Sequence, residues 1–185
     1  MSENSLLESK RANLILRQAK KGEIHMSKSQ VKIESKIGPL YLVGSEKGLQ
    51  GVFWKKQNVP IASGKDGAIE TLLKKSSAQI EEYLNGKRKK FELPLNAEGT
   101  EFQKKVWEEL RKIPYGETRS YKEVAVALKN ANASRAVGTA NGQNPLSLIV
   151  PCHRVISSDG SMGGYAGGLD IKGMLLELEK NGSIQ

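Results

Sequence analysis

The sequence predicts an α+β protein in which a small antiparallel sheet covered by one helix is followed by a helical half with a helix-turn-helix. Two observations lead to this prediction. Hydrophobic residues alternate up to about residue 60 and then follow a helical period, and helix-capping signals become dense from about residue 96. We expect an N-terminal extension over residues 1–25, an α/β domain with a linker over residues 26–95, and a C-terminal domain over residues 96–185.

Three short extended runs form the expected sheet. Val31 and Ile33 alternate with polar residues, and residues 40–43 and 49–54 are extended runs bounded by glycine-containing turns. A helix follows Pro60 and ends at the Asn85-Gly86 stop signal. Its apolar face is formed by Ile69, Leu72, Leu73, Ile80, Tyr83 and Leu84. Residues 87–98 have neither period and predict a linker, in which the basic run at residues 87–90 is solvated.

Capping signals predict the helices of the second half. Thr100 with Gln103, and Ser120 with Glu123, have the spacing of capping boxes, in which each side chain satisfies a backbone N–H at the helix start. A third helix, from about Ala133 to Asn141, follows the second across a short turn. Two short helices in this arrangement are typical of a helix-turn-helix.

The C-terminal segment is predicted to contain one more strand and one more helix. Residues 146–150 are a short apolar run that we expect to be a strand. Asp170 is the expected N-cap of a last helix, and Gly182 is its expected stop signal.

Composition limits the classes of function. The chain is 38% hydrophobic and 26% charged, and no stretch approaches the roughly 18 apolar residues of a membrane span, so we expect no membrane association. A single cysteine excludes an internal disulfide, and with two histidines the chain cannot build a structural zinc site of these residue types, so we expect no metal. These features, with no signal peptide in the first 25 residues, predict the cytoplasm, or the nucleus in a eukaryote.

Positive charge favours an anionic partner. The formal net charge is +9, and Lys and Arg outnumber Asp and Glu by 18 to 10 in residues 1–95 but only by 11 to 10 in residues 96–185. A solubilising surface explains this excess about as well as nucleic-acid binding does.

The single cysteine lies in a reactive context. Cys152 follows Pro151, which restricts the backbone, and precedes His153, which offers a base in the same turn. Arg154 adds positive potential that we expect to lower the pKa of the thiol. An inert core cysteine is the ordinary alternative, but this context favours an activated nucleophile.

Several ordered motifs resemble the O6-alkylguanine-DNA alkyltransferase family over about residues 99–179. The motifs are Phe102-Gln103-x-x-Val106-Trp107, Ile113-Pro114-Tyr115-Gly116-x-Thr118-x-Ser120-Tyr121, Arg135-Ala136-Val137-Gly138-x-Ala140-Asn141-x-x-Asn144-Pro145, Pro151-Cys152-His153-Arg154-Val155 and Gly164-Tyr165-Ala166-Gly167-Gly168. The resemblance implies a ribonuclease-H-like N-terminal domain and a winged-helix-like C-terminal domain.

The resemblance also implies an activity. It implies direct-reversal DNA repair, in which the alkyl group of O6-alkylguanine, and possibly of O4-alkylthymine, is transferred irreversibly to Cys152 after base flipping, in a single turnover and without a cofactor. The partner implied is double-stranded DNA bound through its minor groove by a monomer, with cooperative binding as a possibility.

The roles of individual residues follow from the same resemblance. Cys152 is implied to be the nucleophile, His153 its water-mediated base and Glu179 the residue that orients the histidine. Tyr121 is implied to aid flipping of the base and, with Lys172, to assist the guanine leaving group. Asn144 is implied to brace the active-site turn. The residues implied to bind the substrate are Val155, Tyr165, Ala166 and Gly167, and those implied to bind DNA are Arg135, Ala136, Gly138, Ser120 and Tyr121.

Three alternatives explain parts of the pattern. A non-enzymatic relative that only binds alkylated guanine would lack the cysteine. A winged-helix transcription regulator would explain the helix-turn-helix but not the Cys-His pair or Glu179. A cysteine hydrolase would use Cys, His and Glu, but it would also need an oxyanion hole.

Overall fold

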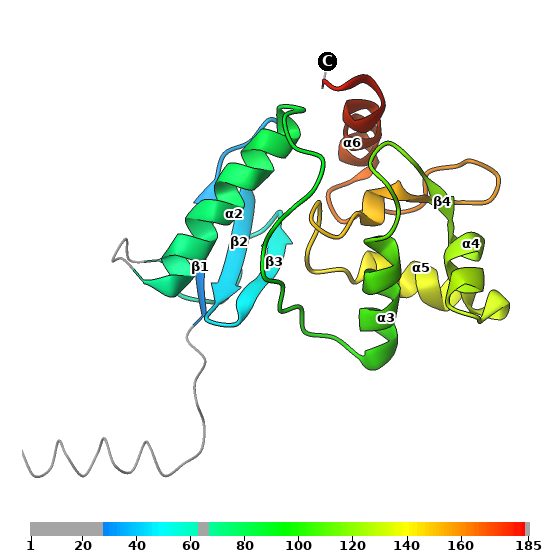
Figure 1. The fold of residues 1–185 in the computed structure, drawn as a ribbon, viewed down its shortest axis with the longest axis horizontal. Coiled ribbons are helices and arrows are strands. Elements are labelled where there is room, and N and C mark those ends of the chain that lie inside the picture. The colour runs from blue at the N-terminus through cyan, green and yellow to red at the C-terminus, as the bar shows by residue number, and fades with distance from the viewer. Residues whose placement is uncertain (1–27, 63–66, 184–185) are drawn as a thin grey trace, which may run out of the picture.

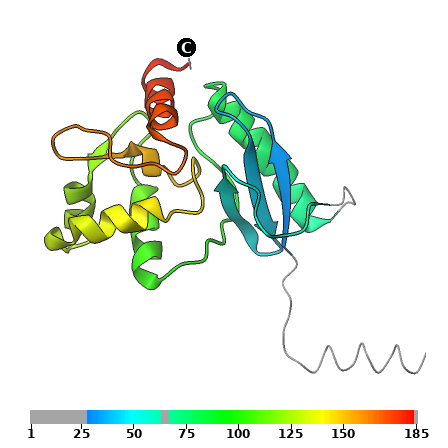
Figure 2. The ribbon, with the colours of Figure 1, turned by 180° about the vertical axis from the view of Figure 1, so that it is seen from behind.

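The computed structural model describes residues 28–62 and 67–183. Figures 1 and 2 show a sheet and helix α2 on one side, and helices α3 to α6 on the other, with the connecting chain running between them. The predicted α+β class is confirmed. The predicted extension over residues 1–25 lies outside the described residues. No helix in the described ranges is long and apolar enough to cross a membrane.

The N-terminal sheet has three antiparallel strands in sequential order. These are β1 (Lys28–Ile33), β2 (Leu40–Ser45) and β3 (Gly48–Phe53). The pairing is irregular between Val43 and Gly44, and Gly44 lies against Leu73 of the helix that covers the sheet, where a methyl group would come within 3.2 Å of that leucine. The strand order confirms the expected antiparallel sheet, and the small residue Gly44 lets the covering helix lie close to it.

Helix α2 (Ala68–Leu84) covers one face of this sheet (Figure 1). Leu73, Ile80 and Tyr83 are at most 2% exposed, as the apolar stripe in the sequence predicts. The helix ends as expected, because Gly86 adopts a positive φ of 72° that glycine tolerates.

The connecting chain is irregular, as predicted, but it is not simply solvated. Leu49 N–H donates to Pro94 O at 2.8 Å, so the connection borders strand β3. The side chain of Arg88 is 23% exposed and pairs with Glu82 at 2.6 Å. Val52 N–H donates to Pro145 O at 2.8 Å, which joins the sheet directly to the C-terminal half. One hydrophobic core continues from the sheet into the helices.

Both predicted capping boxes are present. Helix α3 (Glu101–Leu110) is capped by Thr100 and helix α4 (Tyr121–Ala127) by Ser120. A 3-10 turn, η1 (Ala131–Ala133), leads into α5 (Ser134–Gly142), which confirms the helix-turn-helix arrangement of α4 and α5.

The predicted strand over residues 146–150 is wrong. Leu146 forms an isolated bridge to Val52, and the next residues form a turn. Leu148 has a φ of 71°, outside the range of a strand. The apolar side chains are buried in this turn, with Leu146 and Leu148 each 1% exposed. The apolar run therefore indicated a buried segment. Periodicity alone does not show whether such a short buried segment is a strand or a turn.

The last helix is present, but its predicted N-cap is wrong. Helix α6 spans Leu169–Asn181, and Gly168 occupies the N-cap position. Asp170 lies in the first helical turn, where its negative charge is favourable at the positive end of the helix dipole. Gly182 ends the helix in the left-handed conformation, as predicted. The short strands β4 (Arg119–Ser120) and β5 (Val155–Ile156) pair in parallel just after the cysteine turn.

Replacing the N-cap of α3 tests this description of the C-terminal half. We expect Thr100→Ala to lower the free energy of unfolding by about 1 kcal/mol, because the backbone N–H of Gln103 loses its acceptor. Urea denaturation measures the effect, with exposed Thr118, which caps no helix, replaced by Ala as the control. A loss for Thr100→Ala no greater than that of the control would contradict the capping role.

Candidate active site

A short buried turn holds the cysteine. The 3-10 turn η2 (Cys152–Arg154) follows Pro151, and Cys152 is 3% exposed. Asn144 braces the chain before the turn, since its Nδ2 donates to Val150 O at 2.9 Å and its Oδ1 accepts from Leu146 N–H at 3.0 Å. Asn141 Nδ2 donates to Cys152 O at 3.4 Å. Two amide side chains therefore hold the backbone at and before the cysteine turn.

His153 and Glu179 form a buried pair. His153 Nε2 lies 2.9 Å from Glu179 Oε1, and both side chains are fully buried. Burial lowers the pKa of His153, although the hydrogen bond to Glu179 acts in the opposite direction. A neutral histidine that uses Nε2–H to donate to the carboxylate leaves Nδ1 free to accept, and Nδ1 has no partner among the described residues.

The Glu179 carboxylate binds several donors besides His153. Arg154 Nε donates to Oε2, and Arg154 Nη2 donates to Oε1, each at 2.8 Å. The backbone N–H of Gly116 donates to Oε2 at 3.0 Å. Burial raises the pKa of Glu179, but the hydrogen bonds from His153 and Arg154 outweigh it and lower the pKa well below its usual range. Glu179 is therefore an ionised carboxylate.

The expectation that Arg154 activates the thiol is wrong. Its guanidinium is held by Glu179 and by Ile113 O, at 2.7 Å from Nη1, so its charge is already balanced. Burial raises the pKa of Cys152, and the opposing effects of Asn144 and Lys172 do not overcome it. The raised pKa favours the protonated thiol at neutral pH.

Lys172 holds the two chain segments beside the cysteine turn. Its Nζ donates to Val155 O at 2.7 Å and to Gly163 O at 3.1 Å, and the residue is fully buried. Burial lowers the pKa of this amine, while the nearby Cys152 raises it. Lys172 thus ties the loop of residues 163–168 to the strand that follows the cysteine.

Two aromatic residues border this loop. The Tyr121 ring lies against Gly138 of α5, where an added methyl would contact it at 3.8 Å, and its hydroxyl lies against Gly163. Burial raises the pKa of Tyr121, and the nearby Cys152 adds to the effect. Tyr165 packs edge-on against Trp54 with ring centroids 5.5 Å apart. A methyl group on Gly167 would come within 2.6 Å of the Trp54 indole, so only glycine fits there.

Most of the other predicted substrate and DNA residues lie on or near the surface. Ala166 is exposed on the 163–168 loop, whereas Val155 is fully buried beside Lys172. Arg135 and Ala136 are exposed in the first turn of α5, and Gly138 and Ser120 are half-buried. These helix residues do not converge with Cys152 in one cluster, but Tyr121 spans the space between α5 and the loop.

Sequence reasoning missed two side chains that complete this site, Tyr83 and Trp54, and gave a third, Arg154, the wrong partner. Tyr83 of α2 donates its hydroxyl proton to Glu179 Oε1 at 2.5 Å, Arg154 binds the same carboxylate, and Trp54 at the end of β3 supports Tyr165. Tyr83 was indistinguishable from its apolar neighbours on the helix face.

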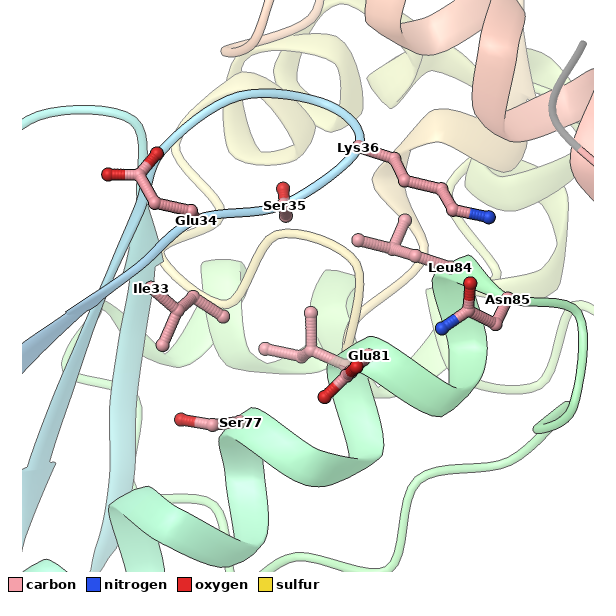
Figure 3. Close-up of a pocket in the computed structure, with 9 residues that line it drawn as sticks. Ile33, Glu34, Ser35, Lys36, Ser77, Glu81, Leu84 and Asn85 are labelled. Atoms are coloured by element: carbon pink, nitrogen blue, oxygen red, sulfur yellow. The ribbon is translucent and has the colours of Figure 1, made fainter.

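A separate cavity lies in the N-terminal half. It has a volume of about 520 Å³ and lies between the loop after β1 and the C-terminal part of α2 (Figure 3). Glu34 and Lys36 of the loop and Ser77, Glu81 and Asn85 of the helix are among its lining residues. None of the residues in the cysteine cluster lines this cavity. Within the described ranges, no group of His, Cys, Asp and Glu could hold a metal ion.

Two family models match the chain. The model described as 6-O-methylguanine DNA methyltransferase, ribonuclease-like domain, matches residues 30–97. The model described as 6-O-methylguanine DNA methyltransferase, DNA binding domain, matches residues 101–181. Between them the models cover most of the chain.

Curated relatives and a solved structure give a consistent result. The methylated-DNA–protein-cysteine methyltransferase of Methanosarcina barkeri is 52% identical over 151 residues, covering 80% of this chain and 95% of that protein. The protein of the same name from Mycobacterium bovis is 42% identical over 157 residues, covering 80% and 90%. The crystal structure of Mycobacterium tuberculosis OGT in complex with DNA matches with a TM-score of 0.74 and 40% identity, covering 82% of this chain and 92% of that one.

Neutralising Glu179 tests the buried charge cluster. We expect Glu179→Gln to lower the free energy of unfolding by about 3–5 kcal/mol near neutral pH, because Arg154 is left as a buried charge without its counterion. Urea denaturation measures the loss. Glu117→Gln, which breaks an exposed pair with Arg119, is the control and should change stability by at most about 0.5 kcal/mol.

The stability lost in Glu179→Gln should depend on pH. Because the folded protein lowers the pKa of Glu179, its contribution to stability is complete above the unfolded value of 4.5 and is lost as the pH falls below it. The difference between the unmodified protein and Glu179→Gln should therefore narrow on acidification. A difference that stays constant from about pH 7 to about pH 3 would mean that the carboxylate is not stabilised by its partners.

Proposed function

This chain belongs to the 6-O-methylguanine DNA methyltransferase family, and from that premise we propose that Cys152 is the sulfur that accepts the alkyl group. The protein repairs DNA by transferring an alkyl group to a cysteine, as a methylated-DNA–protein-cysteine methyltransferase. One observation carries the proposal: Cys152 is the single cysteine of the chain, and it adjoins the buried His153–Glu179 pair.

His153 is the base in the proposed mechanism. Because the resting sulfur is a thiol, its proton must leave before attack. Nε2 of His153 is committed to Glu179, so the proton passes through a bound water to Nδ1. Glu179 then stabilises the imidazolium and keeps the ring oriented, as the third member does in other nucleophile-base-acid sites.

The transfer itself is a displacement at carbon. The thiolate of Cys152 attacks the O6-alkyl carbon in line, a carbon–sulfur bond forms, and the carbon–oxygen bond breaks with its electron pair going to the guanine. The guanine leaves as a neutral base when it receives a proton. Tyr121 and Lys172 assist this leaving group, and the proximity of both side chains to Cys152 supports their roles.

The surroundings of the cysteine form the base pocket in this proposal. Backbone groups of Val155 and Ala166 read the purine edge, and Tyr165 with Gly167 borders the alkyl group. Trp54 packs behind Tyr165 and Gly167, which supports a pocket wall of fixed position. Asn144 keeps the turn in place. The acceptance of O4-alkylthymine in the same pocket is part of the proposal.

Each molecule acts once and without a cofactor in this mechanism. The product is a thioether, which has no easy hydrolytic route back to a thiol, and the sulfur itself is the acceptor. The transfer is therefore irreversible and stoichiometric.

DNA is the partner, and we propose that it is bound through its minor groove with the damaged base rotated out of the stack. An alkyl carbon inside a paired duplex cannot be approached in line by a protein sulfur, so extrusion is required. Arg135, exposed at the start of α5, fills the gap that the base leaves, and Tyr121 promotes rotation. The small residues Ala136 and Gly138, with Ser120, permit close approach of the helices to the backbone.

The proposal extends to the location, the oligomeric state and the domain division of the chain. We propose a cytoplasmic monomer that can bind DNA cooperatively. We also propose a division between residues 95 and 96 into two domains, after an extension over residues 1–25. Separate matches of two family models to residues 30–97 and 101–181 support the division.

Intact-protein mass tests the acceptor. After incubation with a duplex that contains one O6-methylguanine, the unmodified protein should gain one methyl group per molecule, and Cys152→Ala should gain none. No gain by the unmodified protein with retained preference for the lesion would indicate a non-enzymatic binder. Methylation of Cys152→Ala would move the acceptor to another residue.

Arg135 tests base extrusion. We expect Arg135→Ala to slow repair of the lesion in a duplex by at least about tenfold, since filling the gap offsets a few kcal/mol of unstacking. Its reaction with free O6-benzylguanine should be nearly unchanged, because that substrate needs no extrusion. Single-turnover rates measure both reactions. Lys75→Ala, on the exposed face of α2, controls for the loss of one positive charge. Equal slowing on both substrates would argue against a role in extrusion.

A further inference from the structure

Tyr83 brings the N-terminal half into the buried cluster. The residue lies on helix α2, is fully buried, and packs against the rings of Phe91 at 5.2 Å and Tyr115 at 6.1 Å. Its hydroxyl donates to Glu179 Oε1 at 2.5 Å and lies 3.2 Å from His153 Nε2. A core tyrosine needs one partner for its hydroxyl, but this hydroxyl meets both members of the pair assigned to proton transfer.

The Oε1 atom of Glu179 is shared by three donors. Tyr83 donates its hydroxyl proton, Arg154 donates from Nη2 at 2.8 Å, and His153 Nε2 lies at 2.9 Å. Each donor withdraws electron density from the oxygen and leaves less negative potential for the others. Burial and the neighbouring Glu179 raise the pKa of Tyr83 well above its usual value, so the hydroxyl stays protonated and remains a donor.

We propose that Tyr83 is a positioning residue whose hydroxyl shares Glu179 Oε1 with His153 and thereby limits how strongly His153 holds a second proton. The inference rests on the proposed role of His153 as the base. A base must be neutral to accept the thiol proton, and a strong, unshared carboxylate partner would favour the imidazolium before the substrate arrives. Tyr83 weakens this partner while it holds the carboxylate in place.

Other groups that face His153 act in both directions. Glu179 favours the charged ring, and Arg154 and Lys172 oppose it. The remaining titratable side chains around the pair are Cys152 in the same turn, Tyr165 of the 163–168 loop with its ring centroid 6.3 Å from the imidazole, and Tyr115, which packs on Tyr83. Among these side chains, Tyr83 is the neutral donor that directly contacts both Glu179 Oε1 and His153 Nε2.

Tyr83→Phe removes the hydroxyl and keeps the ring. Single-turnover methyl transfer from a duplex with one O6-methylguanine, at saturating protein, is measured against pH. We expect the acid limb of the rate profile to move up by about half to one pH unit, because His153 becomes easier to protonate. At pH values on the acid side of the profile, the rate of Tyr83→Phe should be about three- to tenfold lower than that of the unmodified protein. On the alkaline plateau the two rates should agree within about twofold.

Tyr115→Phe is the matched control. Tyr115 packs edge-on against Tyr83, but its hydroxyl donates to Leu178 O at 3.4 Å and not to the Glu179 side chain. Its removal should leave the acid limb unmoved. A uniform slowing of Tyr83→Phe at every pH, a limb that is unmoved or moves down, or an equal shift in Tyr115→Phe would each overturn the proposal.

A direct measurement separates this inference from the function it rests on. The chain has two histidines, so His25→Gln leaves His153 as the single imidazole signal in an NMR titration. Tyr83→Phe should raise the titration midpoint of His153, and an unchanged or lowered midpoint overturns the inference. His153→Gln tests the base itself: a transfer rate and acid limb unaffected by that change would refute the role of His153, whatever the titration of Tyr83→Phe shows.

Discussion

The carboxylate of Glu179 is the interaction on which the rest of the site depends. It accepts from Tyr83 on α2, from the Gly116 backbone after α3, and from His153 and Arg154 in the cysteine turn. Three segments far apart in the sequence therefore meet at the two carboxylate oxygens that α6 supplies. A buried charge is tolerated only when it is paired and hydrogen-bonded, so these segments must assemble together for the carboxylate to be buried at all.

In this arrangement the residue that balances the charge of Glu179 is not the residue that stays neutral beside the cysteine. Arg154 balances the charge of Glu179, and burial keeps His153 neutral and Cys152 protonated. The resting site thus contains a neutral acid and a neutral base rather than an ion pair. In the proposed mechanism, such a site avoids a reactive thiolate in the absence of DNA and forms one only when the proton moves to His153.

The N-terminal half contributes side chains to the surroundings of the cysteine turn as well as to the core. Tyr83 reaches Glu179 from α2, and Trp54 packs at the end of β3 against Tyr165 and Gly167. The hydrogen bond from Val52 to Pro145 fixes the sheet against the chain that leads to the cysteine turn. The position of the sheet therefore determines which side chain meets the His153–Glu179 pair and what packs behind the loop of residues 163–168.

Local signals in the sequence determined the elements: the alternation at Val31, the capping boxes at Thr100 and Ser120, and the glycine stop at Gly182 each act within a few residues. The position of Cys152 beside His153 indicated a candidate reactive turn for the same reason. The features that depend on burial and on contacts between distant residues were decided by the tertiary structure. In the folded protein the apolar residues 146–150 form a buried turn and not a strand. Arg154 pairs with Glu179 and does not act on the thiol. The tertiary structure also brought Tyr83 to Glu179, because partners 96 residues apart are chosen by packing, which has no local pattern.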